Sequence, residues 1–198
     1  MKKPKKSKSL AIAFAATIIV FTGIYGCVNS GEKETGSQPA TVKTDTKPPK
    51  LEIHAAVLMG DIDAIRQHIA AGTDLEQKDP LGGSTPLITA CVFGKTEVAI
   101  VLMEAGANLD AKNNDGSTPL HCAALFGYPE IVSALLEHGA DKTLKNNAGE
   151  LPSRAVEVSF DKMIPIYDFF SQQLGPLGLK LDYDNLKEKR PQIAEMLK

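Results

Sequence analysis

The side chains best suited to chemistry in this sequence are its histidines and cysteines. They are His54, His68, His121 and His138, together with Cys27, Cys91 and Cys122. No His-x-x-x-His or Cys-x-x-Cys spacing occurs, and no glycine-rich phosphate loop is present. No serine stands in a Gly-x-Ser-x-Gly setting, which nucleophilic hydrolases use. The sequence therefore predicts no catalytic site, no metal centre and no bound cofactor.

The elements that position these side chains come from a repeated unit. Segments 84–116 and 117–149 are each 33 residues long and are identical at 16 positions, where chance would give on the order of two. Ser-Thr-Pro-Leu begins both copies, at Ser84 and at Ser117. A fixed period of this length indicates a stack of small units rather than one globular core.

The second copy shows how such a unit should fold. Pro119 suits the first turn of a helix, because the missing N–H has no partner there to lose. Gly127 ends that helix, Pro129 begins a second one, and Gly139 ends the second. Residues 146–149 then form a turn into the next copy. Each unit is predicted to be helix, turn, helix and hairpin loop.

The repeat resembles the ankyrin repeat, whose signature is Thr-Pro-Leu-His-x-Ala. The segment from Thr118 to Ala123 fits that signature fully. The resemblance implies an all-α fold, an ankyrin-repeat solenoid of helix-turn-helix units joined by hairpin loops. We assign repeats to 51–83, 84–116 and 117–149, and a degenerate fourth repeat to 150–170. The first lacks Thr-Pro-Leu, as expected of a terminal unit.

The C-terminal part departs from the pattern. Pro165 is expected to interrupt the second helix of the fourth repeat. Residues 171–198 are predicted to be a helical cap over the open end of the stack. It should contain one or two short helices, the last beginning at Pro191 and burying Ile193, Met196 and Leu197.

The first 27 residues have the composition of a secretory signal peptide. They contain five lysines, no acid and an apolar run at 10–21. Ile24-Tyr25-Gly26-Cys27 looks like a bacterial lipobox, although a small residue is usual at position 25. This resemblance implies a lipid on Cys27, and the residues after it resemble an outer-membrane sorting pattern. An ordinary cleaved signal and an uncleaved anchor are the alternatives.

Residues 28–50 are predicted to be a disordered tether, because only three of them are apolar. The whole chain has a net charge of −2. Without residues 1–27, 17 basic and 24 acidic residues remain, which gives −7. An acidic chain is a poor ligand for nucleic acid, whose phosphates need lysine and arginine. We therefore expect a protein partner.

The cysteines and histidines of the repeats are expected to be structural. Cys91 and Cys122 fall on neighbouring helices, which lie about 8–10 Å apart, whereas a disulfide needs Cα atoms within about 7 Å. They are predicted to be buried free thiols, although an exported protein could bridge them. The resemblance implies that His54 and His121 hydrogen-bond to the backbone of neighbouring loops.

The binding surface is predicted from two sets of residues. By the resemblance, the positions that end each first helix face a concave groove: Leu58, Met59, Val92, Phe93, Leu125 and Phe126. These six residues are called the groove stripe below. Exposed apolar side chains usually mark an interaction site, although packing between repeats is the alternative. Hairpin tips should add a polar rim: Lys78, Asp79, Leu81, Lys112, Asn114, Asp115, Ser117, Lys145, Asn147 and Glu150.

The sequence favours a non-catalytic interaction protein. We expect a monomer, lipid-anchored in the bacterial outer membrane and facing the periplasm, that binds another protein, as an inhibitor or immunity-type protein does. One alternative is a structural envelope protein that binds the cell wall or itself. Another is an enzyme with a site in residues 150–198, whose candidate carboxylates are Asp161, Asp168, Asp182 and Asp184.

Overall fold

The computed structural model describes residues 47–198, all of which fall in one unit of the chain, 41–198. The predicted signal peptide, the lipobox with Cys27 and most of the tether lie outside the described residues. The described residues form helices and loops, with no strand among them. The all-α prediction is confirmed for this part of the chain.

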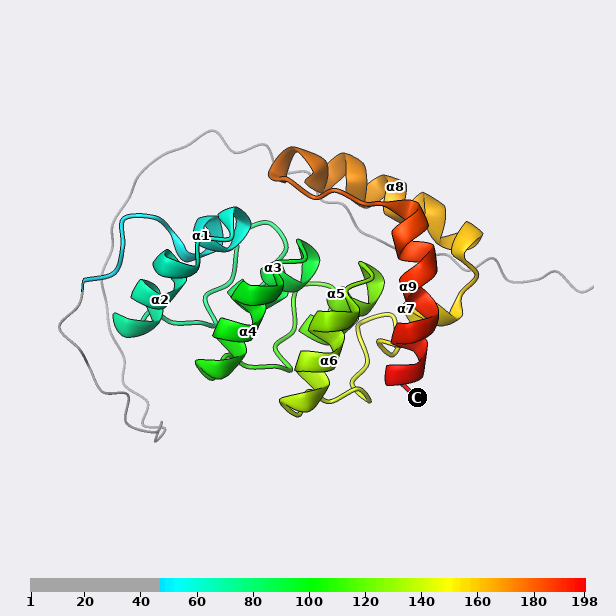
Figure 1. Ribbon diagram of the computed structural model, residues 1–198, viewed down its shortest axis with the longest axis horizontal. Coiled ribbons are helices and arrows are strands. Elements are labelled where there is room, and N and C mark those ends of the chain that lie inside the picture. The colour runs from blue at the N-terminus through cyan, green and yellow to red at the C-terminus, as the bar shows by residue number, and fades with distance from the viewer. Residues whose placement is uncertain (1–46) are drawn as a thin grey trace, which may run out of the picture. The chain divides into compact units, whose positions relative to one another are not determined.

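Three helix pairs follow one another along the chain (Figure 1). They are α1 (Ile53–Met59) with α2 (Ile62–Ala70), α3 (Pro86–Val92) with α4 (Thr96–Glu104), and α5 (Pro119–Leu125) with α6 (Pro129–Glu137). The first helices α1, α3 and α5 contact one another in sequence, and so do the second helices α2, α4 and α6. The pairs therefore stack in parallel layers, as the repeat predicts.

Local signals set the helix ends. A proline occupies the first turn of α3, α5 and α6, where no hydrogen bond is lost. Thr85 caps α3 by accepting the Ile88 N–H at 3.3 Å, and Asp61 caps α2 by accepting the Ala64 N–H at 2.9 Å. Such caps stabilise a helix by about 1 kcal/mol. Helices of seven to nine residues are unstable in isolation, so packing between the helices must supply the remaining stability.

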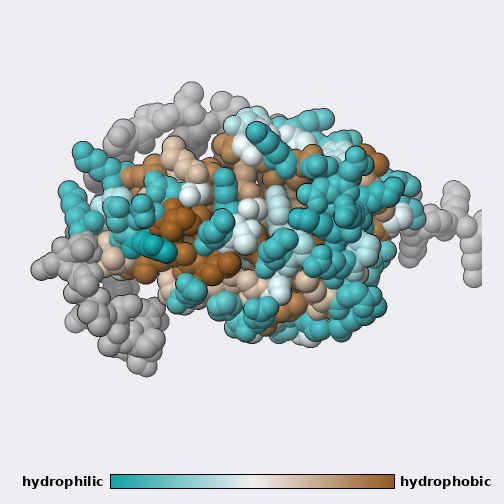
Figure 2. All heavy atoms as spheres, viewed as in Figure 1, coloured by the Kyte–Doolittle hydropathy of each residue, from teal (hydrophilic) through white to brown (hydrophobic). Residues whose placement is uncertain are grey.

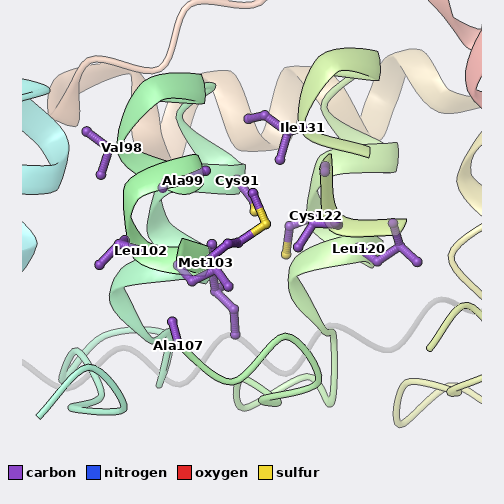
Figure 3. Packing of buried hydrophobic residues seen from close by; sticks show 14 of the residues in the cluster. Cys91, Val98, Ala99, Leu102, Met103, Ala107, Leu120, Cys122 and Ile131 are labelled. Atoms are coloured by element: carbon purple, nitrogen blue, oxygen red, sulfur yellow. The ribbon is translucent and has the colours of Figure 1, made fainter. Parts of the chain in front are cut away.

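That packing comes from a continuous apolar core between the layers. Leu87, Leu102, Leu120 and Leu135 have no exposed surface, and each buried leucine stabilises the fold by about 1.5–3 kcal/mol. Alanines at the ends of the first helices let neighbouring helices approach closely. Figure 3 shows this core where the second and third pairs meet.

Cys91 and Cys122 belong to the same core and are free thiols, as predicted. Figure 3 shows both between α3–α4 and α5–α6. Burial raises the pKa of Cys122 to about 12. Burial, with Cys122 nearby, also raises the pKa of Cys91 well above its usual range. Since the thiolate is the reactive form, neither side chain offers a nucleophile at neutral pH.

The C-terminal helices correct two expectations. They are α7 (Arg154–Glu157), α8 (Phe160–Leu174), the 3-10 turn η1 (Gly175–Leu177) and α9 (Tyr183–Met196). The prediction that Pro165 interrupts a helix is wrong, because α8 continues through it for 15 residues. The prediction that a helix begins at Pro191 is also wrong, because α9 passes through that residue. Burial of Tyr167 in α8 and of Ile193 in α9 offsets the cost of an interior proline, about 3 kcal/mol each.

Helix α9 packs against α6 and α7. Ile193 and Leu197 join the main core, and Met196 packs on it while half-buried. The chain boundaries at residues 51, 150 and 171 remain predictions.

Candidate protein-binding surface

The groove stripe becomes less exposed from the first repeat to the third. Met59 at the end of α1 is 72% exposed, whereas Leu58, Val92, Phe93 and Leu125 are half-buried. Phe126 at the end of α5 is only 3% exposed. The stripe therefore offers an apolar surface at the first two repeats, and the expected exposure of the third is wrong for Phe126.

Helix α8 is what covers the third repeat. The Phe170 ring packs edge-on against the Phe126 ring, with 5.2 Å between centroids. Leu125 packs on a second apolar cluster built from Met163, Tyr167 and Leu186. Figure 1 shows α8 lying across the view, from the α7–α9 end back over the repeats. The sequence indicated an unusually apolar α8 segment but not where it would lie.

The hairpin tips are ordered by the first polar residue of each turn. Asp79 accepts the N–H groups of Leu81, Gly82 and Ser84 at 2.7–2.8 Å. Asn113 and Asn146 each accept two N–H groups in the next two hairpins, at 2.9–3.0 Å. These are turn-forming bonds of the kind that aspartate and asparagine favour. Asp79 is therefore occupied by its own loop.

The hairpins are joined into a row by side chains that reach the next loop. Lys78 Nζ donates to the Lys112 carbonyl at 2.9 Å, and Lys112 Nζ donates to the Lys145 carbonyl at 2.9 Å. Asn147 Nδ2 donates back to the Asn114 carbonyl at 2.9 Å. An ammonium group has three donors, so each exposed lysine keeps two for solvent or a partner. The hairpin row therefore links neighbouring repeats and also presents a polar edge.

The other predicted rim residues differ in exposure. Leu81 is 81% exposed at the first tip, and Asp115 and Lys145 are exposed. Ser117 and Glu150 are half-buried. Glu150 in the loop lies 3.7 Å from Arg154, the first residue of α7. Asn147 is exposed as well, so all three hairpins present exposed polar side chains.

The predicted structural role of the repeat histidines is confirmed. His54 Nε2 donates to the Gln77 carbonyl at 2.9 Å, and His121 Nε2 donates to the Glu150 carbonyl at 3.0 Å. His121 Nδ1 accepts the Thr118 N–H at 3.2 Å, so both ring nitrogens are satisfied by a neutral ring. His68 and His138 bond to the carbonyls of Leu51 and Ala134. These histidines hold backbone rather than substrate.

Residues 53–146 match the family described as ankyrin repeats, in three copies. These residues are ankyrin repeats. The matched segment covers the three helix pairs described above. The fold is accordingly an ankyrin-repeat helical solenoid.

Curated relatives share the same part of the chain. Protein phosphatase 1 regulatory subunit 27 of Mus musculus is 37% identical over 76 residues, 37% of this chain and 49% of that protein. Its Homo sapiens counterpart is 38% identical over 63 residues, 32% of this chain and 40% of that protein. DNA-binding protein RFXANK of Homo sapiens is 35% identical over 75 residues, 38% of this chain and 26% of that protein. The chain spans half or less of the length of these relatives.

Sequence reasoning missed one residue that organises the end of the ankyrin stack. Arg190 of α9 is only 5% exposed. Its guanidinium donates to the carbonyls of Ala155 and Val158 and to the Tyr167 hydroxyl, and lies 5.8 Å from the centre of the Phe160 ring. The signal was available, because Arg190 shares a helix face with the buried Leu186 and Ile193.

Three of the four carboxylates of the enzyme alternative, Asp161, Asp182 and Asp184, lie at helix starts, and Asp168 lies in the middle of α8. Asp182 caps α9 by accepting the N–H groups of Asp184 and Asn185 at 3.1 Å. Asp168 accepts the Tyr183 hydroxyl at 2.7 Å, and Asp161 is exposed in the first turn of α8. No group of three metal-binding side chains occurs within residues 47–198. Over the same residues, no helix is long and apolar enough to span a membrane.

The geometry of His121 makes stability depend on pH. Burial lowers the pKa of His121 below its usual value of 6.5. Below that value the unfolded chain takes up a proton that the folded chain resists, so stability is complete above it and falls as pH decreases toward the folded pKa. We expect His121→Gln to cost about 1 kcal/mol near pH 7.5 and to lose less stability on acidification than the unmodified chain. Urea unfolding of both chains, near pH 7.5 and at a pH below 6.5, checks this. If both chains lose the same stability between the two pH values, the prediction is wrong.

Proposed function

We propose that this protein is a non-catalytic interaction module that holds a protein partner against the groove stripe of its first two repeats. The observation that carries the proposal is the exposed Met59 at the end of α1 and the half-buried Phe93 at the same position of α3, in repeats whose hairpins carry exposed polar side chains. An apolar centre with a polar rim is the anatomy of a protein interface. Ankyrin-type stacks use such extended surfaces for binding.

The relatives support a binding role of this kind. Two are named as regulatory subunits of a phosphatase, and a regulatory subunit acts by contacting another protein. One is named as a DNA-binding protein. We do not extend DNA binding to this chain, because its acidic residues outnumber its basic ones by 24 to 22 even with the lysine-rich N-terminus included.

A double substitution tests the groove. Met59→Ala with Phe93→Ala is expected to reduce partner recovery by at least about tenfold, because large side chains at an interface centre carry most of the binding energy. Recovery is measured by crosslinking and mass spectrometry from detergent-solubilised envelopes. Phe126 is left intact because it anchors α8.

The matched control is Gln67→Ala on α2, an exposed position outside the groove stripe. Circular dichroism should show the same helix content in all three chains. Partner recovery that is unchanged in the double variant, with helix content intact, would remove the groove from the proposal.

We further propose that Cys27 bears a lipid that anchors the chain in the outer membrane of a bacterium, facing the periplasm. The support is the basic start, the apolar run and Gly26-Cys27. Residues 28–50 would then hold the repeats roughly 25–30 Å from the anchor. The folded part would act as a monomer, as an inhibitor or immunity-type protein does.

Metabolic labelling tests the anchor. A bacterium that expresses the full chain with labelled palmitate is expected to label the unmodified protein and leave Cys27→Ala unlabelled. The unmodified protein should also sediment with outer membranes, and the variant should not. Label on Cys27→Ala, or none on the unmodified chain, would refute lipidation and leave the groove proposal untouched.

A further inference from the structure

Each second helix presents one stripe of four side chains on its outer face, at spacing i, i+3, i+4 and i+7, and none of these side chains is fully buried. In α2 the stripe is Asp63, Arg66, Gln67 and Ala70; in α4 it is Glu97, Ile100, Val101 and Glu104; in α6 it is Glu130, Ser133, Ala134 and Glu137. The end residues of all three stripes are exposed, whereas Val98, Ala99, Leu102 and Met103 of α4 are buried. We call Glu97, Ile100, Val101 and Glu104 the α4 stripe.

The middle of the α4 stripe is apolar where its neighbours are polar or small. Ile100 and Val101 occupy the positions that Arg66 and Gln67 hold in α2 and that Ser133 and Ala134 hold in α6. Ile100 and Val101 are half-buried: part of each side chain packs against the edge of the main core, and the rest is exposed to solvent. Figure 2 shows apolar surface gathered where α2 and α4 lie in this view. Since the same fold accepts arginine or serine at this position, the repeat itself does not require an aliphatic pair.

Carboxylates stand at both ends of this pair. Glu97 and Glu104 are exposed and lie about 10 Å apart along the helix. Neither forms an ion pair with any residue in the described part of the chain. In α6, by contrast, Glu130 lies 3.8 Å from Lys189, and Glu137 accepts the Ser133 hydroxyl at 2.7 Å. The two α4 carboxylates are thus available to an incoming cation.

We propose that the α4 stripe is a second docking site, for a helical segment of a partner protein. That segment carries two lysine or arginine residues about 10 Å apart, seven positions along its own helix, with large aliphatic residues between them. Aliphatic contact with Ile100 and Val101 supplies the affinity, and the two cations set register and orientation. This site is separate from the groove stripe and goes beyond the function proposed above.

Charge selects this occupant over the alternatives. A second copy of the chain docking the same stripe would bring Glu97 and Glu104 against their own counterparts, and like charges in contact disfavour association. An anionic lipid surface would be repelled for the same reason. A cationic amphipathic helix is the partner that satisfies both the carboxylates and the aliphatic pair.

Two synthetic peptides test the proposal. Each is about 18 residues long, enough for an alanine-rich helix, with two leucines between two charged residues. The charged residues are lysines in one peptide and glutamates in the other. Fluorescence anisotropy with the full chain is expected to show binding of the lysine peptide only. Raising the salt to about 0.5 M should weaken it at least fivefold, because exposed charges are then screened.

Three variants assign the binding to the α4 stripe. Ile100→Ser with Val101→Ala copies α6 and should weaken binding of the lysine peptide at least tenfold while the helix content stays unchanged. Glu97→Gln with Glu104→Gln should remove most of the salt dependence. Phe93→Ala in the groove stripe should leave the affinity for the lysine peptide unchanged. The proposal for the α4 stripe and the proposal for the groove stripe are therefore tested separately.

Four outcomes would overturn the proposal: no binding of the lysine peptide, equal binding of the glutamate peptide, full binding to the Ile100→Ser, Val101→Ala chain, or loss of binding in Phe93→Ala. Sedimentation equilibrium adds a fifth. If the unmodified chain is a dimer that this double variant dissociates, the occupant is a second copy and the proposal is wrong.

Discussion

Replacing Arg190 by methionine is expected to lower the free energy of unfolding by about 3 kcal/mol, because bonds from a charged donor are each worth about 1.5–3 kcal/mol and their loss leaves buried acceptors unsatisfied. The carbonyls of Ala155 and Val158 and the Tyr167 hydroxyl would lose their donor. Methionine fills similar volume, so the loss reports the hydrogen bonds rather than a cavity. Urea unfolding of the full chain, followed by circular dichroism, measures it.

Lys187→Met is the control for Arg190, since Lys187 is exposed on the same helix. That change should stay within about 0.5 kcal/mol, as surface substitutions do. A loss below about 1 kcal/mol for Arg190→Met would show that α7, α8 and α9 are held by apolar contacts alone.

Substituting Gly116 by alanine is expected to destabilise the stack by about 3 kcal/mol. Gly116 has φ +72°, which costs an L-residue about 1–2 kcal/mol. Its added Cβ would also lie 2.8 Å from the backbone nitrogen of Asn147 in the next hairpin, and relieving such overpacking costs about 1–3 kcal/mol more. Thermal and urea unfolding of the full chain measure the change.

Gly149 provides a matched control at the same place in the next repeat. It has φ +76°, but a Cβ there would meet nothing within 4 Å. Gly149→Ala should therefore cost only about 1–2 kcal/mol, the cost of the left-handed conformation. Equal losses at the two glycines would mean that hairpins do not press on one another as described.

The repeats could be predicted from sequence because their determinants are local. Pro119 at a helix start, Gly127 at a helix end and leucines at helical spacing act within one unit, and the copies reinforce one another. The role of His121 was predicted from the resemblance, and its partners are the N-cap residue Thr118 and the carbonyl of Glu150, where the next unit begins. Short-range rules suffice where each layer touches only its neighbours.

The covered end of the groove could not be predicted because its cause is distant in sequence. Phe126 holds the same repeat position as Phe93, each before a glycine, yet Phe170 of α8 packs on Phe126, which is buried. Pro165 was expected to interrupt a helix and Pro191 to begin one, because local preference keeps proline out of helix interiors. Tertiary packing outweighed that preference, so each proline lies inside a helix.

The hairpin residues illustrate a third limit. Lys78, Lys112 and Asn147 were predicted as contact residues because they are polar and lie at loop tips. Their bonds to neighbouring loops depend on the offset between layers, which composition does not encode. The same side chains can bind a partner, but within the protein they link neighbouring hairpins.

The one-sided packing of the first helix pair gives the repeats an expected order of unfolding. Within residues 47–198, the α1–α2 pair touches a neighbouring pair on one side only, whereas α5–α6 lies between α3–α4 and the C-terminal helices. Thermal fraying should begin at the first pair, where the fewest contacts resist it. Met59 lies on that pair, so a partner that binds Met59 would stabilise the pair that unfolds first. Because such a partner binds the folded state, it would also raise the melting temperature of the protein by mass action.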